Sequence, residues 1–275
     1  MMIRRRADLL CWLLLAATPA VATPAHVPVP GGVAVLDIAA DSRPRVYFND
    51  QRVMVVGAAQ RWSAVVGIPL DTPPGEYRLR AEWQAESRSL PFTVESHDYP
   101  AQHITLQDRR QVNPGPAELR RIERETASMA TLKRHWTDEP LPPLALAPPV
   151  SGRSSSAFGL RRFFNGEPRQ PHAGLDIAAP LGTIVTAAAR GRVSAVGDYF
   201  FNGRTVFIDH GQGLVTMYCH LDRVLVATAD TIQGGDAIGA VGRSGRATGP
   251  HLHWSVYLNG AAVDPTLFLQ SSPAP

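Results

Sequence analysis

Glycine and proline interrupt this chain so often that little of it can form long helices. The 275 residues include 23 Gly and 24 Pro. This frequency of turn-forming residues favours short strands joined by many turns. Apolar residues account for 44% of the chain, which is enough to build a buried core. We therefore predict an all-β fold with a short helical segment, organised as one large or two modest domains.

Residues 1–22 have the pattern of an export signal. They combine the positive stretch Arg4-Arg5-Arg6, an apolar run over residues 9–17 and the small-x-small site Ala20-Val21-Ala22. The apolar run is much shorter than the roughly 20 residues of a spanning helix, so we expect no stable membrane span. We predict cleavage near Thr23 and export to the periplasm or cell envelope.

Charge and cysteine content argue against nucleic-acid binding and against disulfide stabilisation. The export signal carries three Arg and one Asp, so its removal lowers the formal net charge from +3 to +1. The chain also lacks an Arg/Lys-rich run with interleaved aromatic residues, and we expect no nucleic-acid binding. Loss of Cys11 leaves Cys219 as the only thiol, which excludes an internal disulfide.

Three regions follow the export signal. Residues 23–105 contain short alternating segments between turn signals, such as Glu76 to Trp83, and predict a small β-sandwich. Residues 106–150 predict a helix and a proline-rich stretch that is either a semi-rigid linker or a draped segment. Residues 151–275 predict glycine-punctuated strands. We expect these strands at residues 183–188, 191–196, 205–209, 214–218, 237–241 and 251–258.

The predicted helix begins near Pro116, because proline fits the first turn of a helix. Leu119, Ile122 and Met129 fall on one face, and the charged side chains lie elsewhere. This pattern is typical of an amphipathic helix that packs on a domain.

Two histidine motifs have the spacing of metal ligands. In His172-Ala-Gly-Leu-Asp176, both side chains share one face of an extended segment, and Gly174 lets the backbone bend towards one ion. In His251-Leu-His253, two imidazoles share one face of a strand, so that one can bind a metal while the other projects over it. Two histidines, one carboxylate and a fourth position left to water are typical of an open catalytic zinc site.

The other histidines and the cysteine have separate interpretations. His220 joins His251 as a candidate to accept a proton or stabilise an oxyanion. His210 is expected to be a hydrogen-bonded turn residue. Strand alternation would place Cys219 and His220 on opposite faces, which argues against a Cys–His nucleophilic pair. Ordinary surface or core positions are expected for His97, His103 and His135.

Seven motifs over about residues 151–268 occur in an order that closely resembles the lysostaphin/LytM-type zinc metallopeptidases. The motifs are Phe158-Gly-Leu-Arg161, His172-Ala-Gly-Leu-Asp-Ile-Ala-Ala-Pro-Leu-Gly-Thr183, Ile208-Asp-His-Gly211, Tyr218-Cys-His-Leu221, Gly235-Asp236, Gly242-Arg-Ser-Gly245 and Thr248-Gly-Pro-His-Leu-His-Trp254. Residues 23–105 also resemble the immunoglobulin-like domain that precedes some of these peptidases, on the segments Tyr47-Phe48-Asn49, Gly67-Ile-Pro-Leu-Asp71 and Pro73-Pro-Gly75-Glu-Tyr77.

The resemblance implies one zinc ion per chain, bound by His172, Asp176 and His253. It implies that His220 and His251 act on the water and the transition state. It also implies that residues 151–275 form an antiparallel β-sheet peptidase domain with an open groove. The family cleaves peptides of bacterial peptidoglycan, so we expect hydrolysis of stem-peptide cross-links by zinc-activated water.

Two alternatives stay open. Some relatives have lost zinc ligands and activate other wall hydrolases, so the chain could be a non-catalytic wall-binding regulator. All five site positions are filled here, which argues against that role. Residues 106–150 are also long enough to lie across the groove, where they could block it or supply a temporary zinc ligand. The sequence does not identify a regulatory protein partner.

Overall fold

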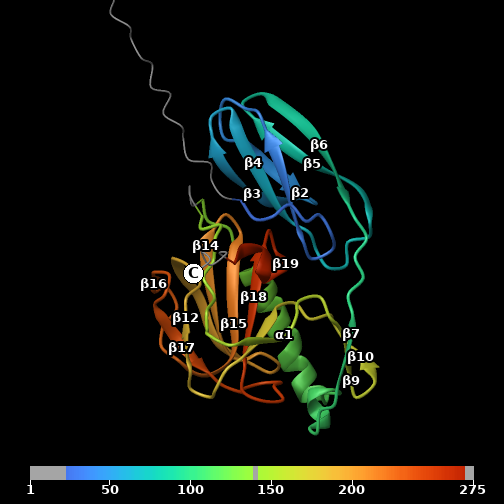
Figure 1. Cartoon of the computed structure of the whole chain (residues 1–275), viewed down its shortest axis with the longest axis vertical. Coiled ribbons are helices and arrows are strands. Elements are labelled where there is room, and N and C mark those ends of the chain that lie inside the picture. Colours follow the sequence, from blue (N-terminus) through green and yellow to red (C-terminus); the bar gives the residue numbers. More distant parts are fainter. Residues whose placement is uncertain (1–22, 139–141, 270–275) are drawn as a thin grey trace, which may run out of the picture.

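A computed structural model describes residues 23–138 and 142–269 (Figure 1). The predicted export signal and Cys11 lie outside the described residues. Strands dominate the described chain, which confirms the all-β prediction with a short helical segment. The helices are α1 (Pro116–Lys133) and the 3-10 turns η1 (Arg109–Gln111) and η2 (Pro265–Phe268). No helix within residues 23–138 or 142–269 is long and apolar enough to cross a membrane.

Six antiparallel strands fold around one core in the first third of the chain. Their order in the sheet is β1-β4-β3-β2-β5-β6. Every strand contributes buried apolar residues to the same cluster, as expected for alternating strands that turn one face inward. The strands are β1 (Val33–Ile38), β2 (Arg45–Phe48), β3 (Gln51–Ala58), β4 (Arg61–Gly67), β5 (Gly75–Trp83) and β6 (Glu86–Val94).

The next strand links the two halves of the chain. β7 (Ala101–Ile104) pairs in parallel with β9 (Arg161–Phe164), and β9 pairs with β10 (Glu167–Pro168). The end of the region predicted as a sandwich therefore contacts the second half of the chain. This small sheet places β9 beside the site described below.

A larger antiparallel sheet forms the second half of the molecule. Its main path runs β16-β13-β14-β15-β18-β11-β8, and β17 pairs with β12 and the end of β15. The strands are β8 (Arg153–Ser156), β11 (Leu175–Ala178), β12 (Ile184–Thr186), β13 (Gly191–Tyr199), β14 (Gly203–Gly211), β15 (Leu214–Val224), β16 (Thr231–Ile232), β17 (Ala237–Val241), β18 (Leu252–Leu258) and β19 (Ala261–Val263).

Helix α1 packs on one face of this sheet, against a cluster formed by residues of β14, β15 and β18 (Figure 1). Pro116 is its first residue, as predicted. Met129 and Leu132 pack against a buried cluster on the sheet. Leu119 is 52% exposed, so its predicted place on the packed face is wrong. The packing contacts with this cluster come from the C-terminal half of the helix.

The two halves share buried surface. Core residues of β1, β3 and β4 pack with Leu214, Leu258 and Val263 of the large sheet. Leu144 and Leu146 from the proline-rich stretch are buried in the same core. Residues 142–150 are therefore draped on the core, one of the two forms predicted for this stretch. A chain that began at residue 151 would lack part of this core.

Candidate metal centre

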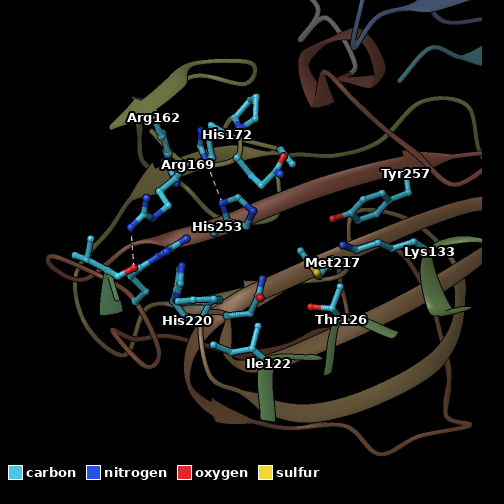
Figure 2. A pocket seen from close by; sticks show the side chains of 17 residues that line it. Ile122, Thr126, Lys133, Arg162, Arg169, His172, Met217, His220, His253 and Tyr257 are labelled. Carbon is cyan, nitrogen blue, oxygen red and sulfur yellow. Dashed lines mark hydrogen bonds between the residues drawn. The ribbon is translucent and has the colours of Figure 1, made fainter. Parts of the chain in front are cut away.

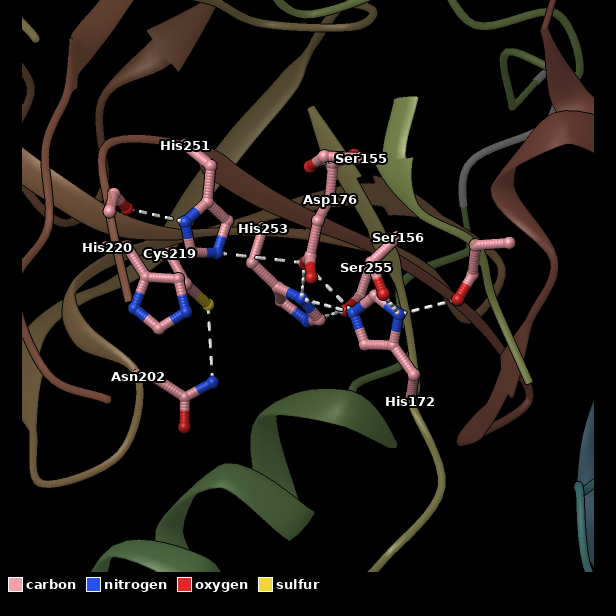
Figure 3. Close-up of polar contacts among 12 residues, drawn as sticks. Ser155, Ser156, His172, Asp176, Asn202, Cys219, His220, His251, His253 and Ser255 are labelled. Atoms are coloured by element: carbon pink, nitrogen blue, oxygen red, sulfur yellow. Dashed lines mark hydrogen bonds and ion pairs between the residues drawn. The ribbon is translucent and has the colours of Figure 1, made fainter. Parts of the chain in front are cut away.

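Three side chains converge at the junction of β11 and β18. Asp176 and His253 are direct partners in the antiparallel register, so their side chains lie on the same face. His172 reaches them from the loop before β11. His172 Nε2 lies 2.9 Å from Asp176 Oδ1 and 3.0 Å from His253 Nδ1, and His253 Nδ1 lies 2.7 Å from Asp176 Oδ1 (Figure 3). All three residues are buried, and we call them the ligand triad.

The outer contacts of the triad leave its inner atoms free to bind a metal. His172 Nδ1 lies 2.6 Å from the carbonyl oxygen of Ala157. Because a carbonyl only accepts, Nδ1 carries the proton and Nε2 presents its lone pair. His253 Nε2 lies 3.0 Å from Ser255 Oγ, on the side away from the triad. Two imidazole nitrogens and one carboxylate oxygen form a donor set that fits zinc.

Electrostatics also favour the ligand forms of these side chains. Burial opposes ionisation of Asp176, but the close polar contacts with the His172 and His253 rings lower its pKa far below the ordinary range. Arg162 donates to Asp176 Oδ2 at 2.8 Å, which leaves Oδ1 facing the two histidines. Burial lowers the pKa of His253 to about 4 despite the Asp176 carboxylate. An ionised carboxylate and a neutral imidazole are the forms that bind a metal.

Gly174 is required by close packing. The chain bends at Gly174, as predicted, but its φ is not in the left-handed region, so the bend alone does not require a glycine. A Cβ at this position would lie 2.6 Å from the carbonyl oxygen of Trp254 and 2.7 Å from both His253 Cε1 and Ser255 Oγ. The chain before β11 therefore passes too close to β18 for any side chain.

His220 and His251 lie beside the triad, as their predicted roles require. The two ring centroids are 4.8 Å apart, and the His220 ring lies 6.0 Å from that of His253. His220 Nδ1 contacts the carbonyl oxygen of Ser244 at 2.8 Å, and His251 Nδ1 contacts that of Gly249 at 2.9 Å. Each Nδ1 is therefore the protonated atom in the neutral ring, and each Nε2 is left as a proton acceptor.

The predicted placement of Cys219 and His220 on opposite faces is wrong. His220 has φ +60°, and β15 carries an extra residue against β14 at this point. This bulge breaks the alternation and turns His220 to the face of His253, the face that Cys219 also occupies through its register with His253. Burial nevertheless raises the pKa of the Cys219 thiol to about 11, so it is not a thiolate nucleophile.

The other histidines lie in separate places. His210 is buried in β14 and contacts the carbonyl oxygen of Arg190 and the hydroxyl of Thr216. It is hydrogen-bonded as predicted, but it lies in a strand and not in a turn. Ring contacts with Tyr99 and Phe163 are made by His97 and His103, and His135 lies 3.5 Å from Asp209.

Sequence reasoning missed three residues around the triad. Ser255 could have been found, because residues two apart on a strand share a face and His253 was already a candidate. Arg162 and Arg246 gave no such signal. They come from β9 and from the loop after β17, which only the tertiary structure brings to the site.

Hollows lie on both sides of the triad. One of about 420 Å³ is lined by His172, His220 and His253 (Figure 2), and another of about 270 Å³ is lined by Asp176 and His251. Helix α1 contributes to the wall of the larger hollow. Among the described residues, the region 106–150 supplies no member of the ligand triad.

Comparison with known proteins places the chain in a family. Residues 26–97 match the model for the peptidase family M23 N-terminal domain, and residues 170–265 match the model for peptidase family M23. A solved M23-family structure from Pseudomonas aeruginosa is 42% identical, with a TM-score of 0.75 over 88% of this chain and 95% of that chain. The chain belongs to peptidase family M23, which confirms the resemblance seen in the sequence.

Curated relatives match the second half of the chain. The DD-carboxypeptidase/endopeptidase Mpg of Neisseria meningitidis is 39% identical over 128 residues, which are 46% of this chain and 30% of that protein. The peptidoglycan DD-endopeptidase ShyC of Vibrio cholerae is 41% identical over 115 residues, which are 41% of this chain and 26% of that protein. The chain thus spans less than a third of the length of these relatives.

Proposed function

We propose that the chain is a zinc-dependent endopeptidase that hydrolyses peptide cross-links of peptidoglycan in the cell envelope. The observation that carries this proposal is the buried ligand triad, with two further histidines beside it and open hollows on both sides. Membership of family M23 and the peptidoglycan DD-endopeptidase activity in the names of relatives support the substrate class. We also propose that the chain consists of an export signal (residues 1–22), an immunoglobulin-like domain (23–105), a helix with a proline-rich stretch (106–150) and a zinc metallopeptidase domain (151–275).

His172, Asp176 and His253 would hold the metal ion. When bound, zinc would supply Lewis acidity that activates water and polarises a peptide carbonyl. Arg162 holds Asp176 in place through Oδ2, and the carbonyl of Ala157 holds the His172 ring. These outer contacts fix the orientation of the ligands in advance of metal binding.

His220 and His251 differ in what surrounds them. Burial and the neighbouring rings of His253 and His251 lower the pKa of His220 to about 3, so this ring stays neutral. His251 Nε2 lies 3.9 Å from Asp176 Oδ1, close enough for the carboxylate to pair with a protonated ring. We therefore assign His251 as the residue that takes a proton from water and passes it to the leaving amine. His220 would position the water through its free Nε2.

The test is digestion of purified peptidoglycan, with the products identified by mass. We expect one zinc per chain, release of peptide cross-links, loss of activity on chelation and recovery with zinc. His253→Ala should abolish both zinc binding and cleavage, whereas His97→Ala, a change at an exposed histidine, should preserve both. Absence of stoichiometric zinc, or unchanged cleavage by His253→Ala, would contradict the proposal. A metal-free protein that stimulates another hydrolase would instead support the regulatory alternative.

A further inference from the structure

The larger hollow beside the triad is strongly positive. Four cationic side chains line it, and none of its lining residues is Asp or Glu. Figure 2 shows Arg162 and Arg169 near His172 and Lys133 near Tyr257 at the opposite end. An excess of cationic side chains in the wall of a concave site attracts anions. The fourth cation is Arg246, which also lines the neighbouring hollow next to η1.

Arg246 differs from the two other arginines in its partners. Arg162 pairs with Asp176 at 2.8 Å, and Arg169 pairs with Glu167 at 2.7 Å. Among the described residues, no carboxylate lies within ion-pair distance of Arg246. Within residues 23–138 and 142–269, its guanidinium contacts one acceptor, the carbonyl oxygen of Gln111 at 3.3 Å. A partly buried cation that lacks a counter-ion is costly, and an anionic ligand would compensate for it.

Arg246 is also held in a fixed orientation. Its guanidinium carbon lies 4.4 Å from the centre of the Phe164 ring and 4.1 Å from that of the Phe201 ring. Burial and the nearby Arg162 and Arg169 lower its pKa to about 10, so it remains charged at neutral pH. A planar guanidinium between two rings suits recognition of a carboxylate, because its donors keep their directions.

The loop that carries Arg246 packs beside the candidate catalytic residue His220. Its backbone N–H donates to the carbonyl oxygen of Phe201 at 2.8 Å. Two residues before it, Ser244 accepts the His220 hydrogen bond. Gly245 approaches the opposite loop so closely that a Cβ would lie 2.4 Å from the backbone nitrogen of Gly203. The loop that carries Arg246 is therefore packed tightly beside His220.

We propose that Arg246 binds a free carboxylate of the peptide substrate and so selects carboxylate-bearing peptides over amidated ones. This inference rests on the proposed peptidase function and specifies its substrate. Peptidoglycan stem peptides carry such carboxylates. The uncompensated cation, its fixed orientation and its place beside His220 together support a substrate-binding role. Lys133 lies at the far end of the same hollow and is available to a longer anionic peptide.

The test uses the full zinc-loaded protein and two substrates. These are cross-linked peptide dimers isolated from peptidoglycan, and the same dimers after their free carboxyl groups are amidated. We expect amidation to lower kcat/KM of the wild type by about tenfold to a hundredfold, chiefly through KM, as for loss of a charge-assisted hydrogen bond. Arg246→Gln should show a similar loss on the carboxylate dimer and little further effect of amidation. Arg243→Gln, an exposed arginine of the same loop, should behave like the wild type.

Three results of the cleavage assay would overturn the inference. The wild type could cleave both dimers equally, Arg246→Gln could keep the full preference, or Arg243→Gln could lose it to the same extent. The wild-type comparison needs no variant, so a misfolded Arg246→Gln protein would not prevent the test. If the wild type cleaved neither dimer, the proposed function would fail. Calorimetric affinities of the two dimers would then test the carboxylate preference separately, and equal affinities would overturn it.

Discussion

Gly174→Ala tests whether close packing of two strands positions the ligand triad. The added Cβ would meet His253 Cε1 at 2.7 Å, whereas ordinary contacts begin at 3.4 Å, a difference of 0.7 Å. The carbonyl oxygen of Trp254 and Ser255 Oγ close the other directions, so β18 and the His253 ring must move. Overpacking of this kind costs about 1–3 kcal/mol of folding stability. A catalytic ligand displaced by this distance would lower activity by up to about 100-fold.

The assay measures zinc affinity by chelator competition and the free energy of unfolding with and without zinc. We expect Gly174→Ala to weaken zinc binding by about tenfold to a hundredfold, as for other changes that misorient ligands. Gly249→Ala is the matched control, because a Cβ there meets no atom within 4 Å. If Gly174→Ala bound zinc and unfolded like Gly249→Ala, packing at this position would not control the geometry of the triad.

Three further predictions concern stability and access to the site. Burial lowers the pKa of His210 from 6.5 to about 4, so its neutral ring stabilises the fold above pH 6.5 and this contribution, at most about 3 kcal/mol, is lost as the pH falls to 4. Denaturant titrations at pH 7 and pH 4 should show that His210→Asn loses less of its free energy of unfolding between the two pH values than the wild type does. An equal loss in both proteins would contradict this. Asn259→Gly keeps the positive φ but leaves the buried N–H and carbonyl of Gly67 unpaired, so it should lower the free energy of unfolding by about 2–4 kcal/mol. A loss under about 1 kcal/mol would show that these two hydrogen bonds do not join the halves of the chain strongly. Arg121 and Glu125 hydrogen-bond α1 to the end of β13 and so hold the helix beside the groove. If residues 106–150 block the groove, replacing both side chains with Ala should raise the rate of peptide cleavage. An unchanged rate would argue against such a block.

The prediction of the fold from the sequence rests on local patterns. Strand alternation and turn residues depend on neighbours along the chain, so the positions of strands such as β5 follow from the sequence alone. The same holds for Pro116 as the first residue of α1. The prediction for Leu119 is wrong because helical periodicity says which residues share a face, but not how far along its length the helix meets a sheet.

For the candidate site too, the sequence identifies residues and the tertiary structure brings them together. The sequence alone predicted His172, Asp176, His220, His251 and His253 as site residues, because each belongs to a short motif and the order of the motifs resembles the family. The tertiary structure decided how these residues meet. The register of β11 against β18 pairs Asp176 with His253, and a bulge in β15 turns His220 to the same face.

Contacts between distant segments could not be read from the sequence. Gly174 is a glycine because β18 passes close to it, and Arg246 keeps a fixed orientation because the rings of Phe164 and Phe201 lie against it. A local pattern fixes the direction of a side chain relative to its neighbours in the chain. The distance to residues from other strands depends on register, bulges and packing, and these are properties of the whole fold.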